Sequence, residues 1–319
     1  MGISTKFWLV TAIALVVIGI IVFAVIMSGY NWDFSELSTV EYEKNTFEID
    51  EEFDSISINT DTSDIIFVIS DDVCKVECYE QKKVKHSAKV IEGRLNIDVT
   101  DNREWYEYIG INFGSPKITV YLPHNEYISL VIKESTGKIE IPKDCKFEEV
   151  DISLSTGDVN FLASAKDLVK IKTSTGNIYA ENISAGALEL SASTGKITVL
   201  NATCEGDIKI NVSTGKISLS DAVCKSLISN GSTGDILLKN VIANEEFSIK
   251  RSTGNVRFDG SDAAEICVVT DTGDVTGALL TDKVFITKTD TGSIDVPKTV
   301  SGGKCEIITD TGDIRINIK

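Results

Sequence analysis

The sequence predicts an all-β fold, a parallel β-solenoid of about ten coils with 19 or 20 residues in each coil. A tripeptide of Ser or Asp, then Thr, then Gly recurs at this interval, and apolar residues alternate with polar ones on both sides of it. Repetition at a fixed period is typical of solenoids, and alternation with a period of two indicates strands with one buried face. The ten glycines are Gly137, Gly157, Gly176, Gly195, Gly215, Gly234, Gly254, Gly273, Gly292 and Gly312.

The first element is an apolar run from Phe7 to Met27 that contains no charged residue. Its length suits one helix across a bilayer and exceeds the apolar core of a cleavable signal peptide, although an unusually long signal peptide is the alternative. The nearest charges are Lys6 before the run and Asp33, Glu36 and Glu41 after it. This asymmetry favours a cytoplasmic tail of residues 1–6, a single-pass membrane anchor and an extracellular body.

A linker of residues 28–45 leads to an N-terminal β region, residues 46–133. Residues 56–67 in this region match the apolar columns of the repeat, with Ser63 at the glycine position, and therefore predict a degenerate first coil. An insertion follows, with strand-like runs at Val73–Tyr79, Lys89–Val99 and Lys117–Leu122. We expect it to cap the open end of the stack, because terminal repeats must block edge pairing.

Residues 134–319 form the repeats themselves. Every copy has Ile or Val two residues after the glycine, and an apolar residue seven residues before it. The column five residues before the glycine is apolar except at Ser229 and Thr287. The glycine itself permits the positive φ of a sharp corner. Stacked at roughly 4.8 Å per coil, ten coils would form a rod about 48 Å long.

Composition limits the partners of the body. The 48 acidic and 31 basic residues give a net charge of −17, which disfavours nucleic acid. The seven cysteines are an odd number without the spacing of a disulfide framework. Cys204 and Cys224 occupy the same position in adjacent coils, within reach of a disulfide. The same position holds alanine in other coils, so we favour the interpretation that both are small buried packing residues.

Three aspartates, Asp271, Asp290 and Asp310, replace the serine of the tripeptide in the last three coils. Asp-Thr-Gly is also the motif of aspartic proteases, whose chemistry needs two carboxylates, one from each of two lobes, that share a proton. Here the aspartate only replaces the serine of the repeat, so the sequence does not indicate a protease. We expect the aspartates to stack on consecutive coils, with Asp274 and Asp313 close by. Such a column would either bind Ca²⁺ or leave its side chains splayed into water. Ca²⁺ is the only cofactor that the sequence suggests.

Outside the repeats, the insertion contains an aromatic cluster of Trp105, Tyr106, Tyr108 and Phe113. Aromatic side chains on a loop can bind an envelope protein or a glycan, but we expect these to form the core of the cap. The two histidines, His86 and His124, belong to no recognisable nucleophile motif, and we expect both to be structural. The sequence therefore predicts no catalytic residue.

The ladder of Ser/Asp-Thr-Gly corners behind an N-terminal apolar span resembles the putative adhesin family, over roughly residues 46–319. Phe53-Asp54-Ser55-Ile56 and Tyr121-Leu122-Pro123 belong to the same resemblance. It implies a bacterial cell-envelope protein of β-strand repeats without an established biochemical function. We expect a non-enzymatic, membrane-anchored protein for adhesion or protein contact. An accessory or sensor protein of envelope-stress signalling is the second hypothesis, and a polysaccharide-acting enzyme is the third, since parallel β-helices also host such enzymes.

Overall fold

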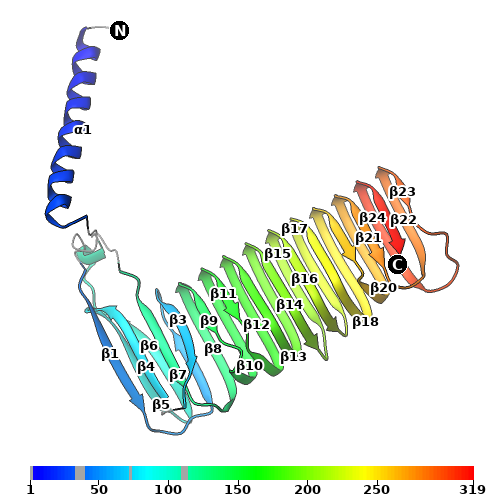
Figure 1. The fold of residues 1–319 in the computed structure, drawn as a ribbon, viewed down its shortest axis with the longest axis horizontal. Helices are drawn as coiled ribbons and strands as arrows, with labels where there is room; N and C mark the ends of the chain where they lie inside the picture. The colour runs from blue at the N-terminus through cyan, green and yellow to red at the C-terminus, as the bar shows by residue number, and fades with distance from the viewer. Residues whose placement is uncertain (1–2, 33–39, 72–73, 109–113) are drawn as a thin grey trace.

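The computed structural model describes residues 3–32, 40–71, 74–108 and 114–319, and its body is a long stack of coils (Figure 1). All 25 strands belong to one continuous sheet system, in which strands of successive coils pair in parallel. The predicted fold class, a parallel β-solenoid with a β cap and one N-terminal helix, is confirmed.

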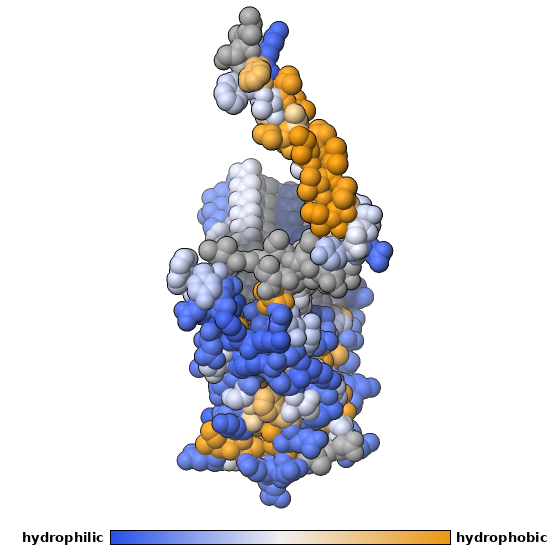
Figure 2. All heavy atoms as spheres, turned by 90° about the vertical axis from the view of Figure 1, so that its left-hand side faces the viewer, coloured by the Kyte–Doolittle hydropathy of each residue, from blue (hydrophilic) through white to orange (hydrophobic). Residues whose placement is uncertain are grey.

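Helix α1 (Ile3–Gly29) contains 27 residues, and its segment Lys6–Gly29 is long and apolar enough to cross a membrane. At about 1.5 Å per residue it extends roughly 40 Å, more than the hydrocarbon thickness of a bilayer. Its side chains make an apolar surface that contrasts with the mostly hydrophilic cap face (Figure 2). The neighbouring residues Asp33 and Glu36, used above to predict the orientation, lie outside the described residues.

The coils bury the predicted columns, except in the outermost coil, where Ile294 is exposed. The position seven residues before the glycine stacks Val150 on Val169 and Leu188, and the position two residues after it stacks Val159 on Ile178 and so on along the rod. These side chains form one continuous core. The strands of the coils are β8 (Glu126–Thr136), β9 (Ile139–Ile141), β10 (Lys146–Thr156), β11 (Val159–Phe161), β12 (Ser164–Thr175), β13 (Ile178–Thr194), β14 (Ile197–Cys204), β15 (Ile208–Thr214), β16 (Ile217–Cys224), β17 (Leu227–Thr233), β18 (Ile236–Thr253), β19 (Val256–Asp259), β20 (Asp262–Thr272), β21 (Val275–Leu279), β22 (Lys283–Thr291), β23 (Ile294–Asp295), β24 (Gly303–Thr311) and β25 (Ile314–Ile318).

The glycine corner has the conformation that the sequence predicts. Gly195 has a φ of 149°, and a Cβ built there would lie 1.9 Å from the carbonyl oxygen of Gly176. The Gly195 N–H donates to the carbonyl oxygen of Thr214 on the following coil. Glycine is therefore required both by the backbone dihedral and by the close approach of successive corners.

A second corner, six residues after the glycine, was not predicted. Asn182, Asn201, Asp221 and Asn240 have φ values of 51–57° there, and Gly260 has 64°. Short polar side chains tolerate this left-handed conformation. The Asn201 side-chain amide donates to Asn182 Oδ1 at 2.6 Å, so the corner residues also form a ladder. The recurring Asn and Asp in this column are the sequence signal for it.

The predicted degenerate coil is confirmed by β2 (Ser55–Asn59) and β3 (Asp64–Ile69). Ile56 and Ile58 pair with Leu130 and Ile132, and a Cβ on Gly137 would lie 2.1 Å from the Ser63 carbonyl oxygen. Ser63 therefore occupies the corner below Gly137. On its other side, β2 pairs with β6 (Arg94–Asp101) and β3 with β7 (Lys117–Leu122), which together add one more layer.

Antiparallel strands close this end, as the cap hypothesis predicts. Strand β4 (Cys74–Gln81) pairs with β7, β1 (Tyr42–Ile49) pairs with β4, and β5 (Val84–Ile91) pairs with β6. The prediction of a single run at Lys89–Val99 is wrong, because Glu92 and Gly93 have φ values of 52° and 75° and turn the chain between β5 and β6. Two positive φ values suit a tight hairpin. Val73, the first residue of another predicted run, lies outside the described residues.

The last two coils do not stack in chain order. Strand β24 pairs with β20 on one side and with β22 on the other, and β25 lies in the same way between β21 and β23. The coil of Gly312 is therefore inserted between those of Gly273 and Gly292. The inserted coil carries Ile307, which is fully buried, where the outermost coil carries Thr287. Burying the more apolar coil and exposing the one with threonine favours this order.

The seven cysteines are all free, and six of them are buried. Cys204 and Cys224 are in the same position of neighbouring coils, as predicted, and both thiols lie in the apolar core. Burial raises the pKa of the Cys224 thiol to about 12. Of the two interpretations, the structure has the packing residues and not the disulfide.

Candidate functional site

The aspartate column lies on the outside of the corner in an order that differs from the prediction. Asp271, Asp310 and Asp290 are all exposed, and the pairing of their threonine neighbours puts Asp310 in the middle. The expected chain order, with Asp290 in the centre, is wrong because the last coil is inserted. Asp290 Oδ1 lies 3.1 Å from Lys288 Nζ, and this pair is exposed to solvent.

Asp274 and Asp313 belong to a different column, directly after the glycine, and their carboxylates are used by the backbone. Asp274 Oδ1 accepts the Asp313 N–H at 2.8 Å, and Asp313 Oδ1 accepts the Ser293 N–H at 2.7 Å. The Ser293 N–H and hydroxyl, with Arg315 nearby, lower the pKa of Asp313. Asp158, Asn177, Asp235 and Asn255 make the same contact in other coils. This column is therefore a structural ladder, whether or not the exposed aspartates bind a cation.

The aromatic cluster forms an exposed turn on the cap. Trp105, Tyr106 and Tyr108 lie on the short helix η2 (Trp105–Tyr108), with 76%, 55% and 59% of their surfaces exposed. The expectation that these side chains form the core of the cap is therefore wrong. Phe113, the fourth member of the predicted cluster, lies outside the described residues.

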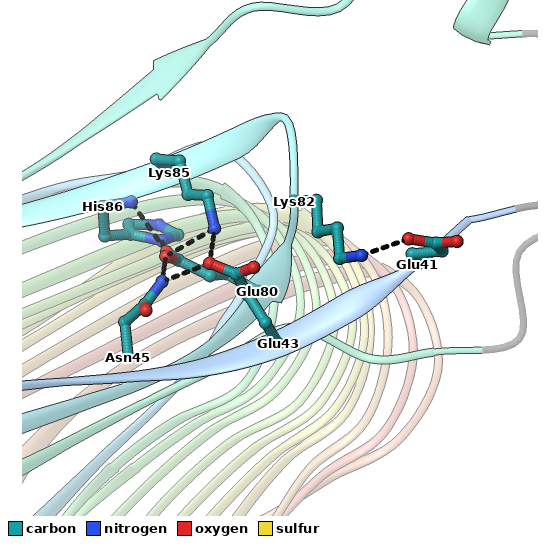
Figure 3. Close-up of polar contacts among 7 residues, drawn as sticks. All are labelled: Glu41, Glu43, Asn45, Glu80, Lys82, Lys85 and His86. Carbon is teal, nitrogen blue, oxygen red and sulfur yellow. Dashed lines mark hydrogen bonds and ion pairs between the residues drawn. The ribbon is translucent and has the colours of Figure 1, made fainter.

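The cap also contains a buried polar cluster that the sequence did not reveal (Figure 3). His86, on β5, places Nδ1 2.7 Å from Glu80 Oε2 and Nε2 2.9 Å from Thr60 Oγ1. Glu80 Oε2 also accepts the His86 backbone N–H at 2.7 Å. The side chains of His86 and Glu80 are only 2% and 1% exposed. The cluster connects the β4–β5 hairpin with the end of β2.

The second carboxylate oxygen of Glu80 is also occupied. Glu80 Oε1 accepts a hydrogen bond from the Asn45 side-chain amide at 2.5 Å and lies 3.8 Å from Lys85 Nζ (Figure 3). Lys85 in turn pairs with Glu43 on β1. One buried carboxylate on β4 is thus bonded to both β1 and β5, and donors from these two strands occupy its two oxygens.

Cys78 completes a group with the residue types of a metal site. Among the described residues, Cys78, Glu80 and His86 are the only three whose ligand atoms all lie within 4.8 Å of one another. Both ring nitrogens of His86 and both oxygens of Glu80 already have partners, so a metal would have to displace these hydrogen bonds. Burial, with Glu80 as a smaller cause, raises the pKa of the Cys78 thiol to about 12. The arrangement therefore suits a structural network better than a metal centre.

The row of Thr60, His86 and Glu80 has the connectivity of a nucleophile, a base and an orienting acid. Thr60 is only 5% exposed, and the small cavity beside it has a volume of about 170 Å³. Because His86 is enclosed, a substrate could reach it only if the cap opened. His124 lies elsewhere on the surface, with Nε2 3.8 Å from Asp71 Oδ1. The two histidines therefore have different surroundings and form no joint site.

A regular surface feature runs along the corner of the rod, and we call it the hydroxyl ridge. It consists of the threonine before each corner residue, flanked by the serines and aspartates of the tripeptide, and every one of these side chains is exposed. Backbone pairing keeps the threonines in register from coil to coil. The threonines are Thr62, Thr136, Thr156, Thr175, Thr194, Thr214, Thr233, Thr253, Thr272, Thr311 and Thr291, in spatial order. Sequence reasoning used these residues only as corner markers.

The coils and the cap place the chain in the class of all-β repeat proteins. The comparison with protein families identifies one family within this class. The sequence matches the Toastrack DUF4097 model over residues 53–212 and again over residues 205–319. The chain belongs to this family, in agreement with the resemblance to the putative adhesins. Membership fits a non-enzymatic protein-contact domain.

The solved structures that are similar to this chain are distant in sequence. A putative lipid binding protein from Parabacteroides distasonis is 18% identical, with 75% of this chain and 98% of that chain covered and a TM-score of 0.50. A putative adhesin from Bacteroides fragilis is 14% identical, with coverages of 87% and 97% and a TM-score of 0.37. A putative cell adhesion protein from Clostridium sporogenes is 12% identical, with coverages of 88% and 100% and a TM-score of 0.24. No curated protein matches the chain.

Proposed function

We propose that this protein is a non-enzymatic, membrane-anchored protein of the cell envelope, whose solenoid presents the hydroxyl ridge for adhesion or protein contact outside the membrane. Helix α1 supplies a segment that can span a bilayer. The cap closes one end of the stack, so the coils extend from it as a rod (Figure 1). The family and the fold support a contact surface of this kind.

The hydroxyl ridge is the observation that carries the proposal. All ten repeats have threonine at the same exposed position, although the core does not require it. Apolar columns are uniform because they pack, whereas an exposed column is free to vary unless something else constrains it. Cross-strand threonine pairs stabilise a sheet by at most about 1 kcal/mol each. A uniform row of hydroxyl groups also offers donors and acceptors at the regular spacing of the coils.

The experiment compares two charge-matched variants of the full chain. The ridge variant carries Thr194→Lys and Thr214→Lys, and the control carries Asn211→Lys and Asn230→Lys, which are exposed on the same or neighbouring coils outside the ridge. Both proteins are tested for capture of partners from envelope extract and for attachment of cells that display them. We expect the ridge variant to lose capture and attachment while the control keeps both. Equal loss or equal retention would show that the ridge is not the contact surface.

A further inference from the structure

The aromatic turn has no role in the proposed contact surface, and its position indicates another. We propose that η2 docks on the bilayer that α1 crosses, with Trp105, Tyr106 and Tyr108 in the headgroup region. This inference depends on the membrane anchoring proposed above. It assigns a lipid interface as the partner of the cap and gives the rod a defined orientation at the membrane.

The turn lies at the end of the body where the chain arrives from α1. A cavity of about 420 Å³ is lined by Val40 and Glu41, the first described residues of the body, together with Arg103, Tyr106 and Glu107. Ten residues lie between Gly29 and Val40, and a fully extended chain of the corresponding eleven Cα–Cα steps reaches at most about 40 Å. The start of β1, and η2 beside it, therefore cannot lie more than about 40 Å from the end of α1, so η2 is on the part of the body that can reach the bilayer.

The side chains of the turn have the chemistry of a membrane interface. Tryptophan and tyrosine are enriched where hydrocarbon meets water, because an apolar ring carries a polar group at its edge. Directly after α1, Tyr30 and Trp32 follow the apolar span and belong to the same type of belt. Three neighbouring aromatic side chains that are exposed together form a patch of the kind that marks an interaction surface.

The charges around the turn compensate one another. Lys82 pairs with Glu41, Lys83 pairs with Glu107, and Arg103 Nε donates to Asp101 Oδ1 at 2.9 Å. Although the whole chain has a net charge of −17, these three pairs neutralise most of the charge beside the aromatic side chains and leave Glu104 as the acidic residue of the turn outside an ion pair among the described residues. The surface therefore suits zwitterionic headgroups and does not require anionic lipid.

The turn is also preorganised. The Tyr108 hydroxyl donates to Asp101 Oδ2 at 3.0 Å, and the Arg103 guanidinium lies 4.3 Å from the Tyr108 ring centre. Trp105 and Tyr106 contact edge to face, with ring centres 5.9 Å apart. Fixed side chains lose little conformational freedom when they bind, so a small surface can contribute to docking.

The test uses the full chain reconstituted in phosphatidylcholine vesicles, with one tryptophan as the reporter in each variant. The chain has three tryptophans, so Trp8→Phe with Trp32→Phe leaves Trp105 alone, and Trp32→Phe with Trp105→Phe leaves Trp8 in α1 alone. The matched control removes all three and introduces Val300→Trp, at a position 95% exposed at the distal end. Each variant is measured with and without phosphatidylcholine brominated on its acyl chains, which quenches only tryptophan near the hydrocarbon.

We expect quenching of Trp105 and Trp8, a shift of Trp105 emission to shorter wavelength, and no quenching at position 300. Quenching of Trp8 without quenching of Trp105 would overturn docking and leave the anchor intact. Absence of quenching at both positions would overturn the anchor and the docking together. A Trp105 emission shift without bromine quenching would show that a protein surface, such as a second copy of the chain, covers the turn, and would also overturn the proposal.

Discussion

Arg251 is a charged side chain inside the core of the solenoid and explains an exception in the repeat. It is 3% exposed and donates to the Val212 carbonyl oxygen at 3.0 Å and to Ser229 Oγ at 3.1 Å. Gly231 provides the space, since a Cβ there would lie 1.6 Å from an Arg251 nitrogen. Burial lowers the pKa of Arg251 to about 10. Ser229 therefore breaks its apolar column because it is a partner of the buried cation.

Removing that partner should destabilise the protein. Ser229→Ala leaves a buried guanidinium nitrogen without an acceptor, which costs roughly 1–3 kcal/mol. The double variant Ser229→Ile with Arg251→Thr restores the residues that neighbouring coils carry, and we expect it to be more stable than Ser229→Ala. Denaturant unfolding of the three proteins measures the difference. An unchanged midpoint for Ser229→Ala would mean that Arg251 finds another acceptor.

Glu134 is a buried carboxyl group at the first true corner. Its Oε1 accepts the Ser63 N–H at 3.0 Å, whereas Oε2 is buried without a hydrogen-bond partner among the described residues. Burial is the main cause that raises the pKa of Glu134 from 4.5 to about 8, and the charges of Asp64 and Asp61 add to it. The folded protein therefore holds a proton on this group at neutral pH.

This raised pKa predicts a pH dependence of stability. The folded state binds the proton more tightly than the unfolded state, so the stabilisation is complete below about pH 4.5 and is lost as pH rises through about 8. Glu134→Gln should remove this loss, and Glu149→Gln, at an exposed position on the next coil, should retain it. Thermal melts between pH 6 and 9 would measure this loss of stability, which is on the order of a few kcal/mol in total. Parallel curves for wild type and Glu134→Gln would contradict the assignment.

At the scale of one coil, the two corners have different requirements. The first corner needs glycine, because a side chain would meet the carbonyl oxygen of the corner below it. The second corner needs only a residue that tolerates φ near 50°, and asparagine meets this condition in three coils. The two corners therefore constrain substitution differently.

Gly195→Ala should lower the free energy of unfolding by about 3 kcal/mol or more, because the new Cβ combines a strained dihedral with a backbone clash. Gly260→Asn is the matched control, since Asn240 occupies the equivalent position of the preceding coil and a Cβ at Gly260 would meet only side-chain atoms, Asn240 Oδ1 and Lys319 Nζ, at 3.3 Å. Calorimetric melting of both variants distinguishes the corners. If Gly195→Ala has the same melting temperature as the wild type, the close approach of the glycine corners is not maintained in solution.

At the scale of the whole molecule, the insertion of the last coil changes which charged neighbours each aspartate has. Asp310 has Asp271 on one side and Asp290 on the other, whereas Asp290 lies at the open end. Asp310→Ser should therefore raise the melting temperature at low ionic strength more than Asp290→Ser does, since it removes two repulsive neighbours. Chain order would predict the opposite ranking, so the comparison also tests the topology.

The same variants test the proposed Ca²⁺ column. If the aspartates bind the cation, the melting temperature of the wild type should rise with Ca²⁺ concentration, as linkage requires. Asp310→Ser should abolish that rise, and the same ionic strength of NaCl serves as the control. A wild-type melting temperature that is insensitive to Ca²⁺ would show that the column is only a solvated acidic edge.

The proposed orientation predicts how intact cells respond to protease. Protease added outside should cleave in the linker, residues 28–45, and remove the body while it spares the segment before about residue 30. Detection of a C-terminal epitope before and after treatment measures this, and permeabilised cells provide the control for total accessibility. A body protected in sealed cells and digested only after permeabilisation would reverse the orientation.

The sequence by itself determined the structure of a single coil, because the residues that shape a coil lie close together in the chain. Alternation fixes which side chains face inward, glycine fixes the first corner, and the degenerate coil at Ser63 could be found from the same columns. Tertiary structure decided which coils are neighbours, because pairing energy is similar for any two coils and relative burial selects between them. For this reason the coil that carries Ile307 lies within the stack and the coil that carries Thr287 lies at its end, against chain order. For the same reason Glu80 and His86 meet Thr60 in the cap. Contacts between segments far apart in the chain leave no periodic trace in the sequence, so only the folded stack reveals them.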